Sequence, residues 1–170
     1  MAAEPKTGGA QGENGDGMRA LDRHDRELLY WLQRDALRTA DDLARDVALS
    51  PSAITRRVRR MRDDGTIVAD VSIVSDAIGP FLSALVDIQL DRHALPHIDA
   101  LLRRLHADPQ VQAIFEITGT FDLTLMVVVA DMAAYNRFAD AMLANDPVIR
   151  RYETRFVKKR RKWSAARPVD

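Results

Sequence analysis

Residues 47–65 read VALSPSAITRRVRRMRDDG, and this stretch decides the fold of the N-terminal half. Ser50 is a favoured N-cap residue, and Pro51 follows it at the first helical position, where a missing N–H does no harm. At 100° per residue, three apolar side chains fall within about 40° of one direction, namely Ile54, Val58 and Met61. The stretch therefore predicts an amphipathic helix that begins after Ser50 and stops at Gly65.

The opposite side of this helix is a candidate DNA-reading surface. Arginine binds guanine edges or phosphates, and short hydroxyls suit either. The other interpretation is a solvated basic helix face, and the capped helix and turn before residue 50 favour DNA binding. The candidate DNA-binding residues are Ser50, Ser52, Thr55, Arg56, Arg57, Arg59 and Arg60.

Two further helical segments precede this helix. Asp22 is a plausible N-cap for the first, and leucines at 28, 29 and 32 repeat at helical spacing. Thr39 with Asp42 resembles a capping box that opens the second. Two helices, a tight turn and a third helix predict a helix-turn-helix unit. The β-prone runs 67–68 and 71–74 are predicted to pair as a short wing, followed by a linker over 75–80.

The second half alternates strands and helices. Alternating apolar residues predict strands over 81–90, 111–118, 122–129 and 148–157, with helices around 95–105 and 135–142. The order β-α-β-β-α-β is the ferredoxin-like arrangement, with both helices on one sheet face. The strand over 122–129 is apolar on both sides, so we expect the other face to pack on a second subunit. The fold class is therefore α+β.

Composition narrows the class of protein. Of the 170 residues 46% are hydrophobic and 29% charged, as in a packed globular protein. The absence of cysteine excludes a disulfide scaffold and thiol catalysis, and fits a reducing cytoplasm. No run approaches about 18 apolar residues, so no membrane span is expected. Residues 1–17 lack the pattern of a signal peptide, 1–19 are predicted to form a disordered tail, and Met18 is an alternative start.

Taken together, these residues resemble the Lrp/AsnC (feast/famine) family of regulators. The resemblance covers about residues 21–158 and rests on motifs in a fixed order. They are Leu21-Asp22, Asp25-Arg26, Leu43-Ala44, Val47-Ala48-Leu49-Ser50-Pro51, Arg57-Val58 with Met61, Gly65-Thr66-Ile67-Val68, Ile117-Thr118-Gly119-Thr120-Phe121-Asp122 and Asp131-Met132.

The resemblance implies a winged helix-turn-helix domain over 20–74 and a ligand-binding RAM domain over 81–158. It implies a cytoplasmic, sequence-specific regulator of double-stranded DNA rather than an enzyme. Its homodimers would form through the sheets and assemble into tetramers or octamers. The effector would be an amino acid or related metabolite bound between RAM domains. The implied effector-binding residues are Glu116, Thr118, Gly119, Thr120, Asp122 and Met132.

The turn over 117–122 has two interpretations. Gly119 can adopt positive φ and expose N–H groups to a carboxylate, while Asp122 can accept bonds from an ammonium group. Alternatively, Asp122 bonds only to its own loop. The second case suits an architectural DNA-binding protein without an effector, whose RAM domain serves only assembly. Arg155 departs from the commoner uncharged residue of the family and suggests an anionic ligand.

Two further patterns carry weaker expectations. His93 and His97 have the i, i+4 spacing of metal ligands, but no third ligand is obvious, so surface histidines and no metal or cofactor are expected. Residues 159–170 form a basic C-terminal tail. Its charges either contact DNA or end the domain in solvent, and the second interpretation is the more common for terminal charge runs.

Overall fold

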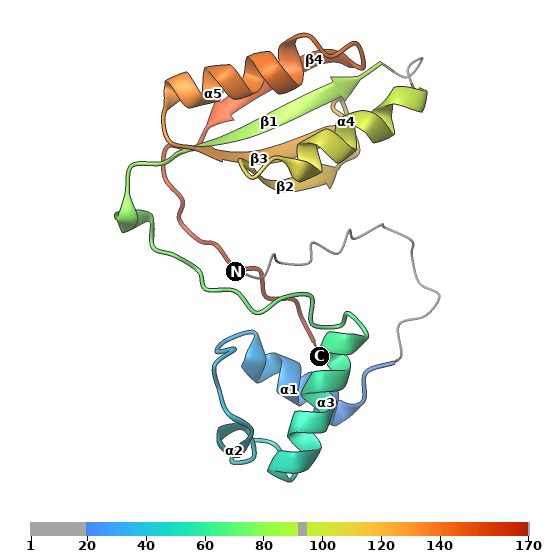
Figure 1. Ribbon diagram of the computed structural model, residues 1–170, viewed down its shortest axis with the longest axis vertical. Helices are drawn as coiled ribbons and strands as arrows, with labels where there is room; N and C mark the ends of the chain where they lie inside the picture. The colour runs from blue at the N-terminus through green and yellow to red at the C-terminus, as the bar shows by residue number, and fades with distance from the viewer. Residues whose placement is uncertain (1–19, 92–94, 170) are drawn as a thin grey trace, which may run out of the picture. The chain divides into compact units, whose positions relative to one another are not determined.

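The computed structural model describes residues 20–91 and 95–169, the side chains at 76, 95 and 96 excepted (Figure 1). The described chain forms two compact units, one of residues 20–72 with 164–169, and the other of the residues from 73 to 163. No helix in the described ranges is long and apolar enough to cross a membrane.

The first unit is built from three helices, α1 (Arg23–Leu32), α2 (Ala40–Leu43) and α3 (Pro51–Asp63). Their apolar faces meet in one core, because each helix carries apolar residues at helical spacing. The buried side chains of this core are Leu28, Leu29, Leu43, Val47, Ile54, Val58 and Met61. The predicted stripe on α3 is thereby confirmed, since its three members are at most 7% exposed.

Local capping signals place the helix starts where the sequence predicts them. Asp22 and Thr39 each form a capping box at the start of α1 and α2. The Oγ of Ser50 accepts a hydrogen bond from the backbone N–H of Ala53 at 3.3 Å. Gly65 follows α3 with φ of 78°, a conformation that favours glycine and ends the helix.

One detail of the first unit differs from the prediction. The short β wing expected over 67–74 is not formed: these residues are described and contain no strand. An isolated two-stranded ribbon is marginal in water unless it packs on something. Val68, Val71 and Ile73 are 87%, 73% and 72% exposed, so this segment buries too little apolar surface to hold paired strands.

The second unit is a four-stranded antiparallel sheet with two main helices, as the ferredoxin-like order predicts. A 3₁₀ turn, η1 (Asp76–Ile78), precedes it. The elements are β1 (Leu82–Leu90), α4 (Leu95–Ala107), β2 (Val111–Glu116), β3 (Leu123–Val129), α5 (Met132–Ala139), a π-turn η3 (Asp140–Ala144) and β4 (Ile149–Phe156). The strand order is β2-β3-β1-β4, which is the order of that fold.

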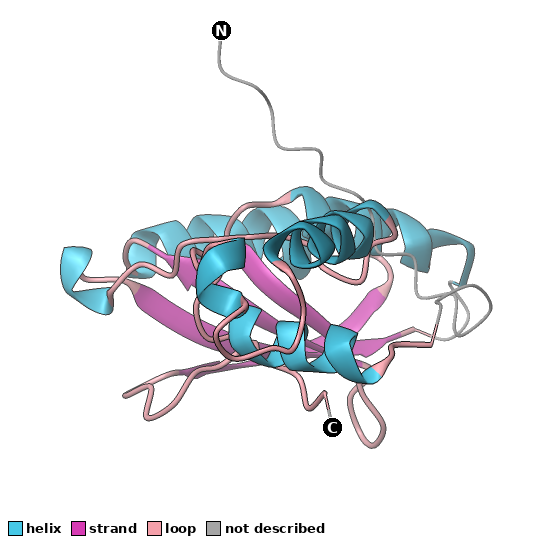
Figure 2. Ribbon diagram, turned by 90° about the horizontal axis from the view of Figure 1, so that it is seen from below, coloured by secondary structure: helices cyan, strands magenta, loops and turns pink. Residues whose placement is uncertain are grey.

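Helices α4 and α5 pack on one face of this sheet, whose strands are magenta in Figure 2. The pleat sends alternate side chains of β1 and β3 into the core between sheet and helices. Val86 pairs with Leu125 in this register, and both are completely buried. No helix among the described residues of the unit packs on the opposite face. It bears Leu85, Met126 and the half-exposed ring of Phe115, which pairs with Thr124 on β3.

Residues beyond β4 return to the first unit. Gln33, the residue after α1, exchanges two hydrogen bonds with Arg167. The backbone N–H of Arg167 lies 2.5 Å from Gln33 Oε1, and Gln33 Nε2 donates to the Arg167 carbonyl at 3.1 Å. Val169 packs against the core of the three helices. The last residues are therefore part of the first unit, a contact that no local sequence pattern signals.

Candidate nucleic-acid interface and ligand site

Helix α3 carries a polar face directed away from the helical core. Its exposed members include Ser52, Thr55, Arg56 and Arg59. The Thr55 Oγ1 donates to the carbonyl of Pro51 at 2.9 Å, and the Ser52 Oγ lies 3.1 Å from that of Ser50. Both hydroxyls are therefore held at the N-terminal end of the helix, the part that enters the major groove in helix-turn-helix proteins.

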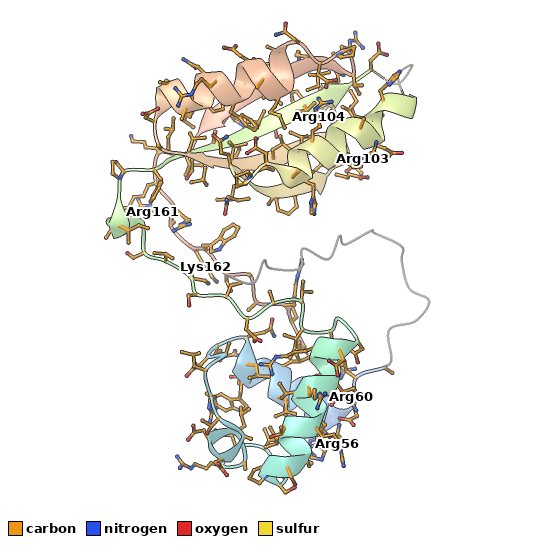
Figure 3. The ribbon with its side chains drawn as sticks, in the orientation of Figure 1. Arg56, Arg60, Arg103, Arg104, Arg161 and Lys162 are labelled. Atoms are coloured by element: carbon orange, nitrogen blue, oxygen red, sulfur yellow. The ribbon has the colours of Figure 1, made fainter. Side chains whose placement is uncertain are left out.

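The two arginines of this face have no close ion-pair partner among the described residues. Arg59 has only a distant partner, Asp63, at 3.9 Å, and both side chains are highly exposed. Arg56 makes no ion pair within the residues that the structure describes. Its side chain is labelled on α3 in Figure 3. Such cations can bind phosphates or guanine without first breaking an internal ion pair.

The two remaining arginines of the predicted set face α1 instead. Arg57 Nη1 lies 2.6 Å from Asp22 Oδ2 and 2.8 Å from Asp25 Oδ1. Arg60 Nη2 lies 2.7 Å from the same Asp25 oxygen. The Asp25 side chain is only 1% exposed. This carboxylate therefore fastens α3 to the first turn of α1 by two charge-assisted hydrogen bonds.

The ion pairs change the acidity of the capping residues. The hydrogen bond from Arg57, aided by the backbone N–H of Asp25, lowers the pKa of Asp22 from 3.8 to about 2. Hydrogen bonds to the carboxylates of Asp22 and Asp25 raise the pKa of Arg57. Asp22 therefore stays ionised to low pH and serves both as the N-cap of α1 and as an anchor for α3.

A second candidate site lies at the turn between β2 and β3. Gly119 has φ of 120°, which a residue with a side chain rarely adopts. The backbone N–H of Asp122 donates to the carbonyl of Ile88 at 2.9 Å, and Asp122 Oδ2 accepts from the N–H of Leu90 at 2.8 Å. Asp122 therefore joins this turn to the end of β1, so part of its function is structural.

A cavity of about 380 Å³ opens beside this turn. Seven residues line it, namely Gln89, Leu90, Asp91, Gly119, Thr120, Asp122 and Arg150. The lining combines one guanidinium, two carboxylates and an amide. Charged groups of both signs can bind a zwitterion, with the guanidinium on its carboxylate and a carboxylate on its ammonium group.

The cavity contains only part of the predicted effector set. Gly119, Thr120 and Asp122 line it, and Thr118 lies exposed in the same turn. Two predicted residues lie outside the lining: Glu116 ends β2, and Met132 begins α5. Met132 follows the far end of β3, a strand about 20 Å long, so it lies far from the turn within one chain.

Four lining residues, Leu90 and three polar ones, escaped prediction because they come from other strands. Gln89 and Asp91 lie at the end of β1, and Arg150 lies at the start of β4. The pairing of Gln89 with Arg151 brings these strand ends together. The sequence signal was polar residues at the ends of two predicted strands, but their adjacency depends on the strand register.

Arg155 is engaged elsewhere. Its guanidinium forms an ion pair with Asp87 on the uncovered sheet face, and Asp87 Oδ1 accepts from Thr124 Oγ1 at 2.6 Å. Arg155 is not among the cavity residues, so the structure gives no support to its selecting an anionic ligand there. Asp87 is one of two charged residues that are buried in the described chain, the other being Asp25.

The structure describes one histidine of the predicted i, i+4 pair. His93 lies outside the described residues, and His97 is exposed on α4. Among the described residues, no group of three or more potential ligands could hold a metal ion.

Comparison with known proteins identifies both units. Residues 83–166 match the family model of the Lrp/AsnC ligand binding domain, and residues 21–68 match that of a winged helix-turn-helix DNA-binding domain. The chain is 34% identical over 151 residues to an uncharacterized HTH-type transcriptional regulator of Sinorhizobium fredii, covering 88% of this chain and 89% of the relative.

The chain belongs to the Lrp/AsnC family of transcriptional regulators.

Solved structures of Lrp/AsnC proteins agree with this assignment. An AsnC family regulator from Agrobacterium tumefaciens has a TM-score of 0.78 at 29% identity, covering 88% of this chain and 97% of that one. The regulator NMB0573 from Neisseria meningitidis, solved as an L-methionine complex, has a TM-score of 0.77 at 26% identity, with 89% and 98% covered. These Lrp/AsnC relatives are DNA-binding transcriptional regulators and not enzymes, which confirms that expectation.

Proposed function

We propose that this Lrp/AsnC protein is an oligomeric regulator that reads specific DNA sites with α3, and that an amino acid or related metabolite bound at the turn over 117–122 modulates it. The observation that carries the proposal is the division of labour on α3. Arg57 and Arg60 hold the helix through Asp25, while Arg56 and Arg59 on the outer face remain available for DNA.

The outer face fits major-groove recognition. Two arginines supply bidentate donors for guanine edges or phosphates, and the hydroxyls of Ser52 and Thr55 stand beside them. The seven residues predicted for DNA binding thus divide by position. We assign base and phosphate contacts to the outer members, and a positioning role to Arg57 and Arg60. Ser50 is mainly the helix cap.

Selection of bound duplexes from a random pool tests this assignment. Wild-type protein should enrich a motif of two related half-sites about one helical turn apart, as a two-fold dimer requires. The Arg56→Ala/Arg59→Ala variant should enrich no motif. The Arg103→Ala/Arg137→Ala variant, which removes the same charge from exposed positions of α4 and α5, should enrich the wild-type motif. Enrichment of that motif by the Arg56/Arg59 variant would contradict the assignment.

The cavity chemistry supports an α-amino acid as the effector class. Arg150 can bind the carboxylate, and Asp91 or Asp122 the ammonium group. The Neisseria relative is described as an L-methionine complex, which is consistent with this class. Glu116, Thr118 and Met132 are then proposed as contacts from a neighbouring RAM domain, because they do not line the cavity of their own chain.

A thermal-shift screen of the twenty amino acids tests the effector. A ligand that binds only the native state stabilises it by about 2.7 kcal/mol at a hundredfold excess over Kd, and this stabilisation raises Tm. We expect at least one amino acid to do so, and Arg150→Ala to abolish the shift. Arg103→Ala is the control and should keep it. If no amino acid changes Tm or assembly, the protein fits the alternative of an architectural DNA-binding protein without an effector.

Assembly is proposed to occur through the uncovered sheet face. Leu85, Met126 and Phe115 form apolar surface there, and such surface favours contact with a second protein. A homodimer would then assemble into a tetramer or octamer. A regulator that binds double-stranded DNA is expected to work in the cytoplasm.

A further inference from the structure

Residues 158–162 read KKRRK, and this basic run closes the second unit, directly before residues 164–169 of the first. All of its side chains are exposed and no acidic residue interrupts it. Lys158, Lys159, Arg161 and Lys162 form no ion pair within the described residues. Figure 3 shows Arg161 and Lys162 projecting from a segment without helix or strand.

The run is held at both ends, so it is not a free tail. Before it, the backbone N–H of Val157 donates to the carbonyl of Ser83 at 2.8 Å and fixes the end of β4 to the sheet. After it, Arg167 bonds to Gln33 and Val169 packs on the helical core. The basic run is therefore the last part of the second unit and is joined through residues 163–166 to a segment anchored in the first.

The second anchor limits how far the charges can move from the DNA-reading unit. An extended chain spans at most about 3.6 Å per residue, so Lys162 lies within about 18 Å and Lys158 within about 32 Å of Arg167. One turn of a duplex is about 34 Å long. The run is thus kept at high local concentration beside any duplex that the first unit binds.

We propose that residues 158–162 form a second DNA contact that binds the phosphate backbone of the duplex next to the site read by α3. This inference rests on the proposed function of α3. The contact reads no sequence, because lysines and arginines on a segment without helix or strand do not present a defined pattern to base edges.

The absence of internal ion pairs favours phosphate as the ligand. Each unpaired cation that meets a phosphate releases a condensed counterion, which supplies most of non-specific affinity. Arg57 and Arg60 would first have to break their ion pairs with Asp25. No such ion pair within the described chain has to be broken at four positions of the run, namely Lys158, Lys159, Arg161 and Lys162.

The test is a salt titration of binding to a 60-base-pair duplex of fixed arbitrary sequence, measured by fluorescence anisotropy. The Arg161→Gln/Lys162→Gln variant should bind more weakly than wild type. Its slope of log K against log salt should be shallower by up to about 1.8 per bound chain, because each lost phosphate contact removes about 0.9. Arg161→Lys/Lys162→Arg, which keeps both charges, should retain the wild-type slope.

A matched control separates this contact from general charge effects. Arg103→Gln/Arg137→Gln removes two exposed charges from the second unit and should leave both slope and affinity unchanged. Equal slopes and affinities for wild type and Arg161→Gln/Lys162→Gln would overturn the inference, while loss of slope in the control would show that only net charge matters and would overturn it as well.

The outcome is distinguishable from failure of the proposed function. That function fails if wild type selects no sequence motif, or if the Arg56→Ala/Arg59→Ala variant keeps selecting it. Under the present inference, the Arg161→Gln/Lys162→Gln variant still selects the wild-type motif, since its contacts are to phosphate only. A changed motif for that variant would contradict the assignment of the run to the backbone.

Discussion

At the residue scale, one buried carboxylate organises the DNA-reading helix. Asp25 accepts hydrogen bonds from Arg57 and Arg60 at 2.8 and 2.7 Å and completes the capping box of α1. Burial of an ion is unfavourable, and here two guanidinium partners offset it. Removing this charge leaves Arg60 without its ion-pair partner among the described residues, and Arg57 with Asp22 alone.

Asp25→Asn should therefore lower the free energy of unfolding of the first unit by about 3 kcal/mol, since breaking a buried pair is strongly destabilising. Urea denaturation followed by circular dichroism measures this. Asp63→Ala, which removes an exposed acid 3.9 Å from Arg59, should change stability by less than about 0.5 kcal/mol. Similar midpoints for the two variants would show that Asp25 is not an anchor.

The lowered pKa of Asp22 predicts an acid-labile contact. Between pH 3.8 and about 2 the unfolded chain takes up a proton on Asp22 that the folded chain does not, because Arg57 holds the folded carboxylate ionised. The stabilisation is therefore complete above pH 3.8 and is lost as pH falls towards 2. Urea midpoints across pH 2–5 should fall less steeply for Asp22→Asn than for wild type, and parallel curves would contradict this role.

Prediction at this scale succeeded where the partner is local. The caps at Asp22, Thr39 and Ser50 lie three residues or fewer from their targets, so composition and spacing indicate them. The roles of Arg57 and Arg60 depend on an acid more than thirty residues away, and the lining role of Arg150 depends on strand register. Neither relation is visible in a local pattern.

At the scale of elements, the turn between β2 and β3 depends on the conformation of a single glycine. Gly119 has φ of 120°, and no atom lies within 4 Å of the place where a Cβ would stand. The expected effect of a side chain is thus backbone strain and not steric collision.

Gly119→Ala should destabilise the second unit by about 1–3 kcal/mol, the usual range for a residue in such a disfavoured region. The substitution should also lower the affinity of any ligand that binds in the cavity. The comparison is Gly79→Ala, where φ is 175° and a Cβ would make ordinary contacts at 3.7 Å with Phe81. Thermal unfolding of both variants is the measurement, and equal Tm values would show that the turn tolerates side chains.

Periodicity predicted the order and type of the main elements because each has one buried side. The alternation in β1 and β3 and the apolar stripe of α4 fix a sheet with one covered face. Paired strands are not formed over 67–74 because the β-branched residues at 68–74 indicate strand propensity but bury little. Propensity without burial does not make a strand.

At the scale of the whole molecule, the uncovered sheet face carries apolar side chains that no helix of the unit covers. Phe115 is 52% exposed there, beside Met126 and Leu85. Apolar side chains that remain at least partly accessible on a sheet face favour assembly, as proposed above.

Phe115→Asp should shift the protein towards monomer, because a charge would have to be buried in the apolar interface. Size-exclusion chromatography with light scattering measures the mass. Leu37→Asp alters a side chain that is 91% exposed in the first unit and should leave the mass unchanged. An unchanged assembly for Phe115→Asp would place the interface elsewhere.

The most direct test of DNA reading by α3 compares its outer and inner arginines. The quantity is the ratio of Kd for an arbitrary duplex to Kd for the selected site, measured by anisotropy at one salt concentration. Arg56→Ala/Arg59→Ala should reduce this ratio by about tenfold or more, since a lost base contact is worth 1–3 kcal/mol. Arg60→Lys keeps a charge beside Asp25 and should leave the ratio within about twofold of wild type. An undiminished ratio for the Arg56/Arg59 variant, or a collapse confined to Arg60→Lys, would contradict the account.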